Sequence, residues 1–149
     1  MTLESKLKLR DFEGLRLKAY DDSTGQTLIQ GDKLIGKLTV GYGRNLTDRG
    51  ISHDEAEMML ANDLNIATAE ARSAFDWFDR LDPVRQDFIV MMIFNIGVPR
   101  LKGFKKMLAA IEAQDWGQAG AELVDSTWAK QVGNNRADAM RRAIETGEW

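Results

Sequence analysis

The sequence of 149 residues contains no cysteine, two prolines and a single histidine. Without cysteine the chain cannot form disulfides, use a thiol nucleophile or bind a metal through thiolates. Because His53 is the only histidine, a multi-histidine zinc centre is impossible, and a Ser-His-Asp triad would have to use that one residue. His53 lies within a helix-start motif, where we expect an ordinary surface side chain.

Long apolar runs and a strong charge of either sign are also missing. The most apolar run, residues 88–98, is interrupted by Asn95 and is too short to cross a bilayer. The basic residues near the N-terminus are not followed by an apolar stretch, so we expect no signal peptide and no transmembrane segment. The net charge of −3 argues against a general nucleic-acid binder.

The composition, 44% hydrophobic and 29% charged, is that of a globular protein, and the length suits one domain. At the start, we expect a helix over residues 2–13, with Thr2 as its N-cap and Gly14 as its stop. Three short strands are then predicted, over residues 15–20, 27–30 and 38–42. The second and third would pair as a hairpin whose tip is residues 31–37.

From Ser52 onward, apolar residues recur at helical spacing. Ser52 and Glu55 have the form of a capping box that opens a long helix reaching about residue 75. Asp82 and Pro83 open a second helix, which is apolar on almost every side and should lie at the centre of a bundle. That helix is expected to end at Gly97 and Pro99, and three more should follow, over residues 101–111, 116–123 and 135–144.

This order predicts an α+β fold with two unequal lobes. A small antiparallel β-sheet forms the N-terminal lobe, over about residues 12–60. A larger helical bundle over about residues 75–149, together with the first helix, forms the other lobe, and the long helix joins the two. No repeat or linker divides the chain, so residues 1–149 should be one domain.

Residues 31–37 match the first seven positions of a phosphate-binding loop, but two observations exclude it. The eighth position should be Ser or Thr to hold magnesium, and it is Leu38. A strand pattern follows the loop, where a helix N-terminus would be needed. We therefore expect no nucleotide cofactor.

Two carboxylates could cooperate in acid–base chemistry. Glu13 ends the first helix, where the negative end of the helix dipole disfavours a charged carboxylate and so favours a proton donor. Asp22 lies in the polar turn after the first strand. Cleavage of a glycoside requires at least one protonated and one ionised carboxyl group in the same cleft. The alternatives are that Glu13 is a solvated surface residue and that the Asp22 side chain only stabilises its own turn. Thr39 alternates with Leu38 and Val40, so it should face solvent if those two face the core.

These residues carry a resemblance. The run from Glu13 to Tyr20, then Asp22, then Thr39-Val40-Gly41-Tyr42-Gly43, resembles the N-terminal lobe of the T-even phage lysozyme family. Similar motifs continue in order along the chain, at Leu81-Asp82-Pro83-Val84-Arg85, Phe94-Asn95, Gly103-Phe104, Trp128, Asn135-Arg136-Ala137 and Thr146-Gly147-Glu148-Trp149. The resemblance implies a lysozyme-like fold over nearly the whole chain.

The resemblance also implies roles for individual residues. Glu13 would be the general acid, Asp22 would hold or activate the attacking water, and Thr39 would help to position that water. Phe94 and Asn95 would face the substrate.

Arg136 would reach across to the catalytic glutamate. The chain departs from the family pattern at Arg44, where the family often has a histidine. It departs again in the long gap between Asp22 and Thr39, which leaves Thr27 as an alternative to Thr39.

By this resemblance the chain is an endolysin, a muramidase that cleaves the β-1,4 bond between N-acetylmuramic acid and N-acetylglucosamine with inversion and lyses the host cell. No metal and no cofactor are expected. The partner would be the peptidoglycan glycan strand, with no nucleic acid, no stable membrane insertion and a monomeric enzyme that stays in the host cytoplasm until it is released to the wall. A lytic transglycosylase and a non-catalytic peptidoglycan-binding module are the alternatives.

Overall fold

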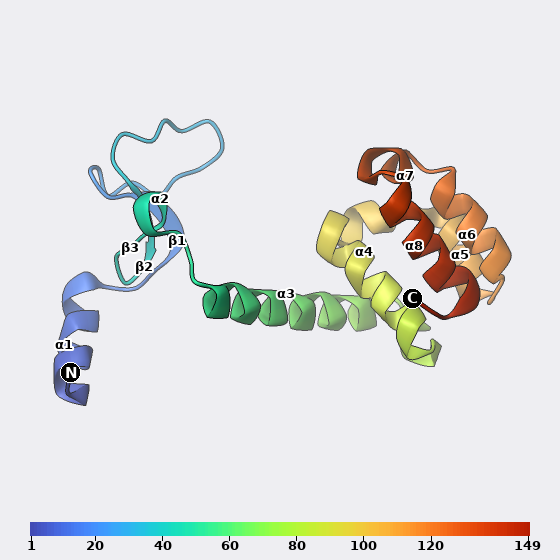
Figure 1. Cartoon of the computed structure of the whole chain (residues 1–149), viewed down its shortest axis with the longest axis horizontal. Coiled ribbons are helices and arrows are strands. Elements are labelled where there is room, and N and C mark those ends of the chain that lie inside the picture. The colour runs from blue at the N-terminus through green and yellow to red at the C-terminus, as the bar shows by residue number, and fades with distance from the viewer. The chain divides into compact units, whose positions relative to one another are not determined.

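The computed structural model describes all 149 residues and divides into two compact units, Met1–Glu57 and Met58–Trp149 (Figure 1). The first unit combines a helix with a small sheet, and the second is entirely helical. The boundary falls within α3 (His53–Ala74). The predicted α+β class, with a small antiparallel sheet and a larger helical part, is confirmed. None of the helices combines the length and the apolar character that crossing a bilayer requires.

The first unit begins with α1 (Leu3–Glu13), as the sequence predicts. The Thr2 hydroxyl accepts a hydrogen bond from the Ser5 N–H and so caps the helix start. Three strands form an antiparallel sheet in the order β1-β2-β3, and a short helix follows them. The bounds of these elements are β1 Arg16–Asp21, β2 Leu38–Gly41, β3 Arg44–Asn45 and α2 Leu46–Arg49.

The prediction of a strand over residues 27–30 is wrong, and so is the hairpin with its tip at residues 31–37. Only a single bridge, between Tyr20 and Thr27, joins that segment to the sheet. β1 pairs directly with β2, and the third strand is β3 instead. Ile29 is largely exposed, so the segment buries no apolar face that would hold it as a strand.

The capping box predicted at the start of α3 is present. The Ser52 N–H donates to Glu55 Oε2 at 2.7 Å, and the Glu55 N–H donates to Ser52 Oγ at 3.3 Å. Glu55 also pairs with Arg44, which donates from Nη1 to Glu55 Oε2 at 3.1 Å and to the Gly50 carbonyl at 3.2 Å. The arginine that departs from the family pattern thus ties β3 to the start of α3.

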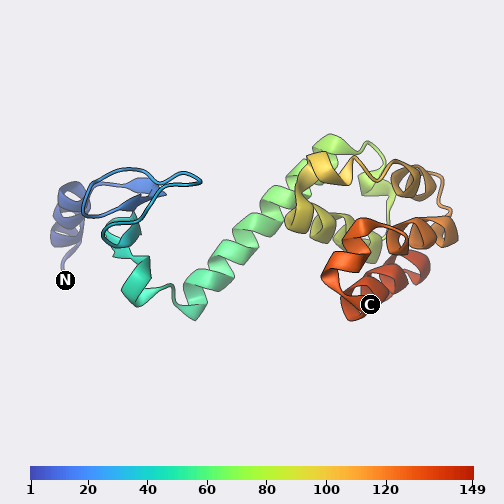
Figure 2. The ribbon, with the colours of Figure 1, turned by 90° about the horizontal axis from the view of Figure 1, so that it is seen from above.

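The second unit consists of the rest of α3, a short 3₁₀ helix and five further helices (Figure 2). Their bounds are η1 Phe78–Arg80, α4 Pro83–Leu101, α5 Lys105–Glu112, α6 Trp116–Val124, α7 Thr127–Val132 and α8 Asn134–Thr146. Asp82 caps α4, as predicted, and Gly97 breaks its regular geometry with φ 73°. The sequence analysis predicted no helix at α7, and α8 begins directly after Gly133, which occupies its N-cap position.

α4 supplies the centre of the second unit's core, as its apolar sequence predicts. Phe88, Ile89 and Met92 are fully buried. α8 packs against α4, α6 and α7, and α5 packs against α6. Their buried contributions are large apolar side chains, namely Leu101, Met107, Ile111, Leu123, Met140 and Ile144. Close packing of this kind is what holds a helical bundle together.

Arg85 fixes the end of α8 against the start of α4. Its side chain is only 11% exposed and forms an ion pair with Asp82 at 2.7 Å. It donates further hydrogen bonds to the carbonyls of Ile144 at 2.8 Å and Glu145 at 3.0 Å. Its guanidinium carbon lies 4.0 Å from the centroid of the Trp116 ring. Carbonyls in the last turn of a helix lack intrahelical partners, so Arg85 satisfies groups that α8 cannot satisfy itself.

We predict that Arg85→Met, which keeps the length of the side chain but removes its donors, lowers the free energy of unfolding by about 2–4 kcal/mol. The matched control is Arg72→Met, which removes an exposed ion pair with Asp79 and should change stability by less than about 1 kcal/mol. Chemical denaturation followed by circular dichroism measures both. Equal losses in the two variants would contradict the structural role of Arg85.

Candidate active site

Glu13 is the last residue of α1, as predicted, and its side chain is exposed. Gly14 follows with φ 67°, and its N–H donates to the Arg10 carbonyl at 2.9 Å, which closes the helix. A non-glycine residue would be strained in this left-handed conformation. Gly14 therefore turns the chain into β1 directly after the candidate acid.

The turn between β2 and β3 lies against Glu13. A Cβ atom added at Gly43 would lie 2.9 Å from Glu13 Oε2, so Gly43 leaves room for that carboxylate. The Tyr42 hydroxyl accepts hydrogen bonds from Arg10 Nε at 3.0 Å and Nη2 at 2.8 Å. The sequence analysis missed Arg10 and Tyr42, although Gly41-Tyr42-Gly43 was part of the motif. Together they tie the last turn of α1 to the turn beside the candidate acid.

Asp22 follows directly after β1 and is exposed. Its N–H donates to the Lys37 carbonyl at 3.1 Å, and its Oδ1 accepts the Lys37 N–H at 2.6 Å. No protein N–H donates to Asp22 Oδ2. One carboxylate oxygen is therefore anchored while the other can accept a hydrogen bond from water.

Thr39 is 4% exposed, so the prediction that it faces solvent is wrong. Its neighbours Leu38 and Val40 are only half-buried, so burial alternates along β2 in the opposite sense to the predicted one. The Thr39 hydroxyl donates to the Lys37 carbonyl at 3.2 Å. That same carbonyl accepts the Asp22 N–H, so the structure brings two of the predicted residues to one backbone group.

The alternative threonine, Thr27, is exposed and lies opposite Tyr20 in the isolated bridge. Its hydroxyl accepts a hydrogen bond from Arg16 Nη2 at 3.1 Å. Unlike Thr39, it shares no partner with Asp22. The geometry therefore favours Thr39 over Thr27.

The other three predicted residues lie in the helical unit. Asn95 is exposed, and its Oδ1 accepts a hydrogen bond from Trp128 Nε1 at 2.8 Å, which leaves the Asn95 amide nitrogen without a protein partner. Phe94, beside it, is 50% exposed. Arg136 is exposed in the first turn of α8.

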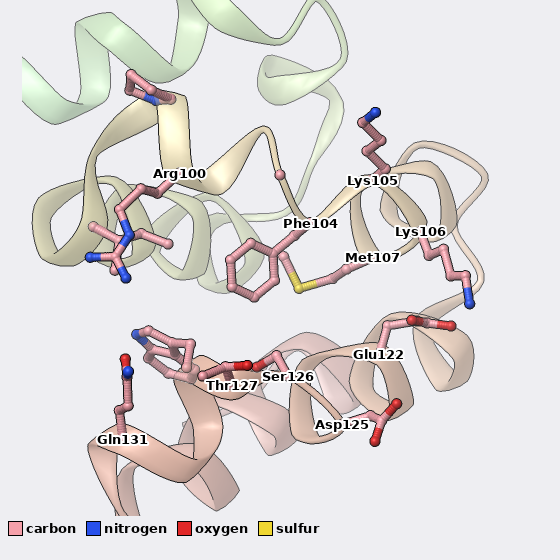
Figure 3. Close-up of a pocket in the computed structure, with 14 residues that line it drawn as sticks. Arg100, Phe104, Lys105, Lys106, Met107, Glu122, Asp125, Ser126, Thr127 and Gln131 are labelled. Carbon is pink, nitrogen blue, oxygen red and sulfur yellow. The ribbon is translucent and has the colours of Figure 1, made fainter.

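The helical unit also contains a pocket of about 610 Å³ (Figure 3). Phe104 and Met107 lie on one side and Ser126 and Thr127 on the facing side. The rim carries charges of both signs, from Arg100, Lys105, Lys106, Glu122 and Asp125. None of these pocket residues was predicted as a site residue. No group of three or more His, Asp or Glu side chains in the structure is arranged to hold a metal ion.

Asp21 is a further residue that sequence analysis missed. It is the most buried polar side chain, at 1% exposure. Its carboxylate accepts the N–H of Ile35 at 2.6 Å and of Gly36 at 3.1 Å from one end of the loop. From the other end it accepts the N–H of Ser23 at 2.9 Å and of Thr24 at 3.4 Å. The Ile35 N–H is the largest influence in holding the pKa of Asp21 below 3.8, against the opposite effect of burial.

We predict that the Ile35 and Gly36 amide proton resonances shift together on acidification, with a midpoint below pH 3.8. A carboxyl group whose pKa is lowered by folding contributes stability that is complete above its unfolded pKa. That contribution is lost as the pH falls through the folded pKa. Two-dimensional NMR between pH 6 and pH 2 follows the two amides, and a midpoint at or above 3.8 would contradict the role of these hydrogen bonds.

Comparison with known proteins gives matches that cover most of the chain. A family model described as phage lysozyme matches residues 10–145. The chain is 28% identical over 165 residues to the probable T4-type lysozymes 1 and 2 of Dictyostelium discoideum, covering 99% of this chain and 96% of each relative. It is 31% identical over 160 residues to the pre-baseplate central spike protein Gp5 of Enterobacteria phage T4, covering 93% of this chain and 27% of that protein. The family match contains every predicted site residue, namely Glu13, Asp22, Thr39, Phe94, Asn95 and Arg136.

Proposed function

Because the chain belongs to the phage lysozyme family and is therefore a glycosidase acting on peptidoglycan, we propose that Glu13, Asp22 and Thr39 carry its chemistry. The reaction is hydrolysis of the β-1,4 bond between N-acetylmuramic acid and N-acetylglucosamine. The observation that supports this most strongly is the family match over residues 10–145, which spans all three residues. The enzyme acts as a monomer from the host cytoplasm and lyses the host cell once it is released to the wall.

Glu13 is the general acid in this proposal. It protonates the glycosidic oxygen as the bond to the leaving sugar breaks and positive charge develops on the other sugar. It is the last residue of α1 and its side chain is exposed, so the carboxyl group is open to substrate. The space left by Gly43 allows the carboxyl group to lie against the turn without a clash.

Asp22 and Thr39 hold the attacking water. The unanchored Oδ2 of Asp22 accepts a proton of the water, and the Thr39 hydroxyl, which still has acceptor capacity, fixes its orientation. Attack from the face opposite the leaving group inverts the anomeric centre. Inversion requires a gap of roughly 6.5–9.5 Å between the two carboxyl groups, so that a water molecule fits.

Residues of the helical unit bind the glycan. The Asn95 amide nitrogen, left free by the hydrogen bond from Trp128, donates to a polar group of the substrate. The exposed ring of Phe94 packs against the apolar face of a sugar. Arg136, exposed in the first turn of α8, contributes a positive charge to glycan binding.

We predict that Glu13→Gln reduces lysis of peptidoglycan by at least about a hundredfold while leaving the melting temperature unchanged or raised. The amide has almost the same shape but cannot donate an acidic proton, and removing a negative charge from the C-terminal end of a helix is favourable. A turbidity assay on bacterial cell walls measures lysis. Glu4→Gln, at the other end of α1, is the matched control and should retain activity. Normal lysis by Glu13→Gln would contradict the assignment, and so would loss of stability in place of activity.

We predict that Asp22→Asn lowers the turnover number by at least about tenfold and that the residual products carry ordinary reducing ends. Mass spectrometry of the released fragments separates reducing sugars from anhydro-sugars, which differ by one water. Full activity in Asp22→Asn together with anhydro-muramic products would move the protein to the lytic transglycosylases. A wild-type chain that binds walls without releasing fragments would make it a binding module.

A further inference from the structure

We propose that Asp21 is a positioning residue for the attacking water. Its buried carboxylate, together with the close packing of Gly36, holds the peptide that fixes Asp22 and Thr39. This inference rests on the function proposed for Asp22.

Asp21 accepts hydrogen bonds from both ends of one long loop. The segment between β1 and β2 has no strand to pair with, so its amide groups need other acceptors. Asp21 accepts amides from Ser23 and Thr24, directly after β1, and from Ile35 and Gly36, just before β2. A single carboxylate thus brings the end of the loop back to its beginning.

The end of the loop can approach its beginning this closely only because Gly36 has no side chain. A Cβ atom at Gly36 would lie 2.1 Å from Ser23 Oγ, 2.3 Å from Asp22 Oδ1 and 2.8 Å from Asp21 Oδ1. All three distances are shorter than any real contact of a Cβ atom. The backbone of Gly36 therefore packs directly on the side chains of both aspartates.

The peptide held in this way carries the groups that anchor the water-holding residues. Lys37 follows Gly36, and its N–H donates to Asp22 Oδ1. Its carbonyl accepts both the Asp22 N–H and the Thr39 hydroxyl. Through Lys37, the position of Asp21 determines where Asp22 and Thr39 lie, although Asp21 itself is too buried to touch substrate.

The expected result of weakening this anchor is a lower turnover number with little change in KM. The reacting atoms would be misplaced, and a displacement of about 1 Å in a catalytic group can cost up to a hundredfold in rate. Glu13 lies outside this loop, at the end of α1 beside Gly43, so its role as acid is retained. A merely structural role would lower the melting temperature without lowering the turnover number of the folded enzyme.

The test is a double-mutant cycle on the full chain with soluble peptidoglycan fragments as substrate. The variants are Asp21→Asn, Asp22→Asn and the two combined, assayed well below their melting temperatures. In Asp21→Asn, an NH2 group replaces one carboxylate oxygen, and this group cannot accept hydrogen bonds from the loop N–H groups. Asp32→Asn is the matched control, because Asp32 lies in the same loop and accepts only the Ile29 N–H.

We expect Asp21→Asn to lower kcat about tenfold with KM within about twofold of wild type, and Asp32→Asn to retain wild-type kcat. In the double variant the loss should be clearly smaller than the product of the two single losses. If Asp22→Asn is impaired while Asp21→Asn has normal kcat, or if the losses multiply in full, the positioning role is wrong and the proposed function stands. If Asp22→Asn itself has normal kcat, the proposed function of Asp22 fails, and the positioning role fails with it.

Gly36→Ala provides a second test that leaves Asp21 intact and applies even if Asp21→Asn does not fold. Its added methyl group would displace the Asp22 side chain, so kcat should fall by a factor similar to that of Asp21→Asn. The loss in the double variant Gly36→Ala/Asp22→Asn should likewise be smaller than the product of the two single losses. Gly117→Ala, where an added Cβ meets no atom closer than 4.0 Å, is its control. Normal kcat in Gly36→Ala would overturn the proposal.

Discussion

A loop that joins two strands without forming a strand of its own must find acceptors for its backbone amides. In the first unit Asp21 meets this constraint, with one buried carboxylate that receives amides from both ends of the loop. The rest of the unit depends on that arrangement. Because Asp21 brings Lys37 back to the end of β1, β2 can pair with β1 in its observed register, Asp21 opposite Leu38. The candidate residues Asp22 and Thr39 then meet at the backbone of Lys37.

The helical unit satisfies a comparable constraint in a different way. Its core is apolar and closely packed, but the last carbonyls of α8 need donors, and Arg85 supplies them while pairing with Asp82. Burial by itself would raise the pKa of Asp82, yet the hydrogen bonds from the Arg85 side chain and backbone lower it overall. The two units thus share one device, a charged side chain that completes backbone hydrogen bonds where regular structure ends.

Local signals in the sequence predicted the parts of the fold that short-range interactions determine. The capping box at Ser52 and the cap at Asp82 were correct, because each requires only residues within one helical turn. The strand over residues 27–30 was wrong because a short alternating pattern cannot show whether a partner strand lies beside it. Thr39 was placed on the wrong face for a related reason, since burial on a three-stranded sheet depends on neighbours that alternation alone does not reveal.

The candidate site could be predicted only in part. Glu13 and Asp22 stood out by their chemistry and spacing, whereas Asp21 beside Asp22 looked like turn composition, because its partners are far away in sequence. Gly36 gave no usable signal, because its close packing against Asp21 and Asp22 is visible only in three dimensions. Tyr42 was visible within its motif, yet nothing in the sequence connected it to Arg10.

The central claim is that Glu13 donates a proton while water held by Asp22 attacks from the opposite face. The most direct test is proton NMR of a peptidoglycan fragment during the first minutes of cleavage, before the new reducing end equilibrates between anomers. Inversion of a β-1,4 bond predicts that the α-anomer of N-acetylmuramic acid appears first and that the β-anomer grows in later. A β-anomer that appears first would show retention, which would contradict direct attack by a water held at Asp22.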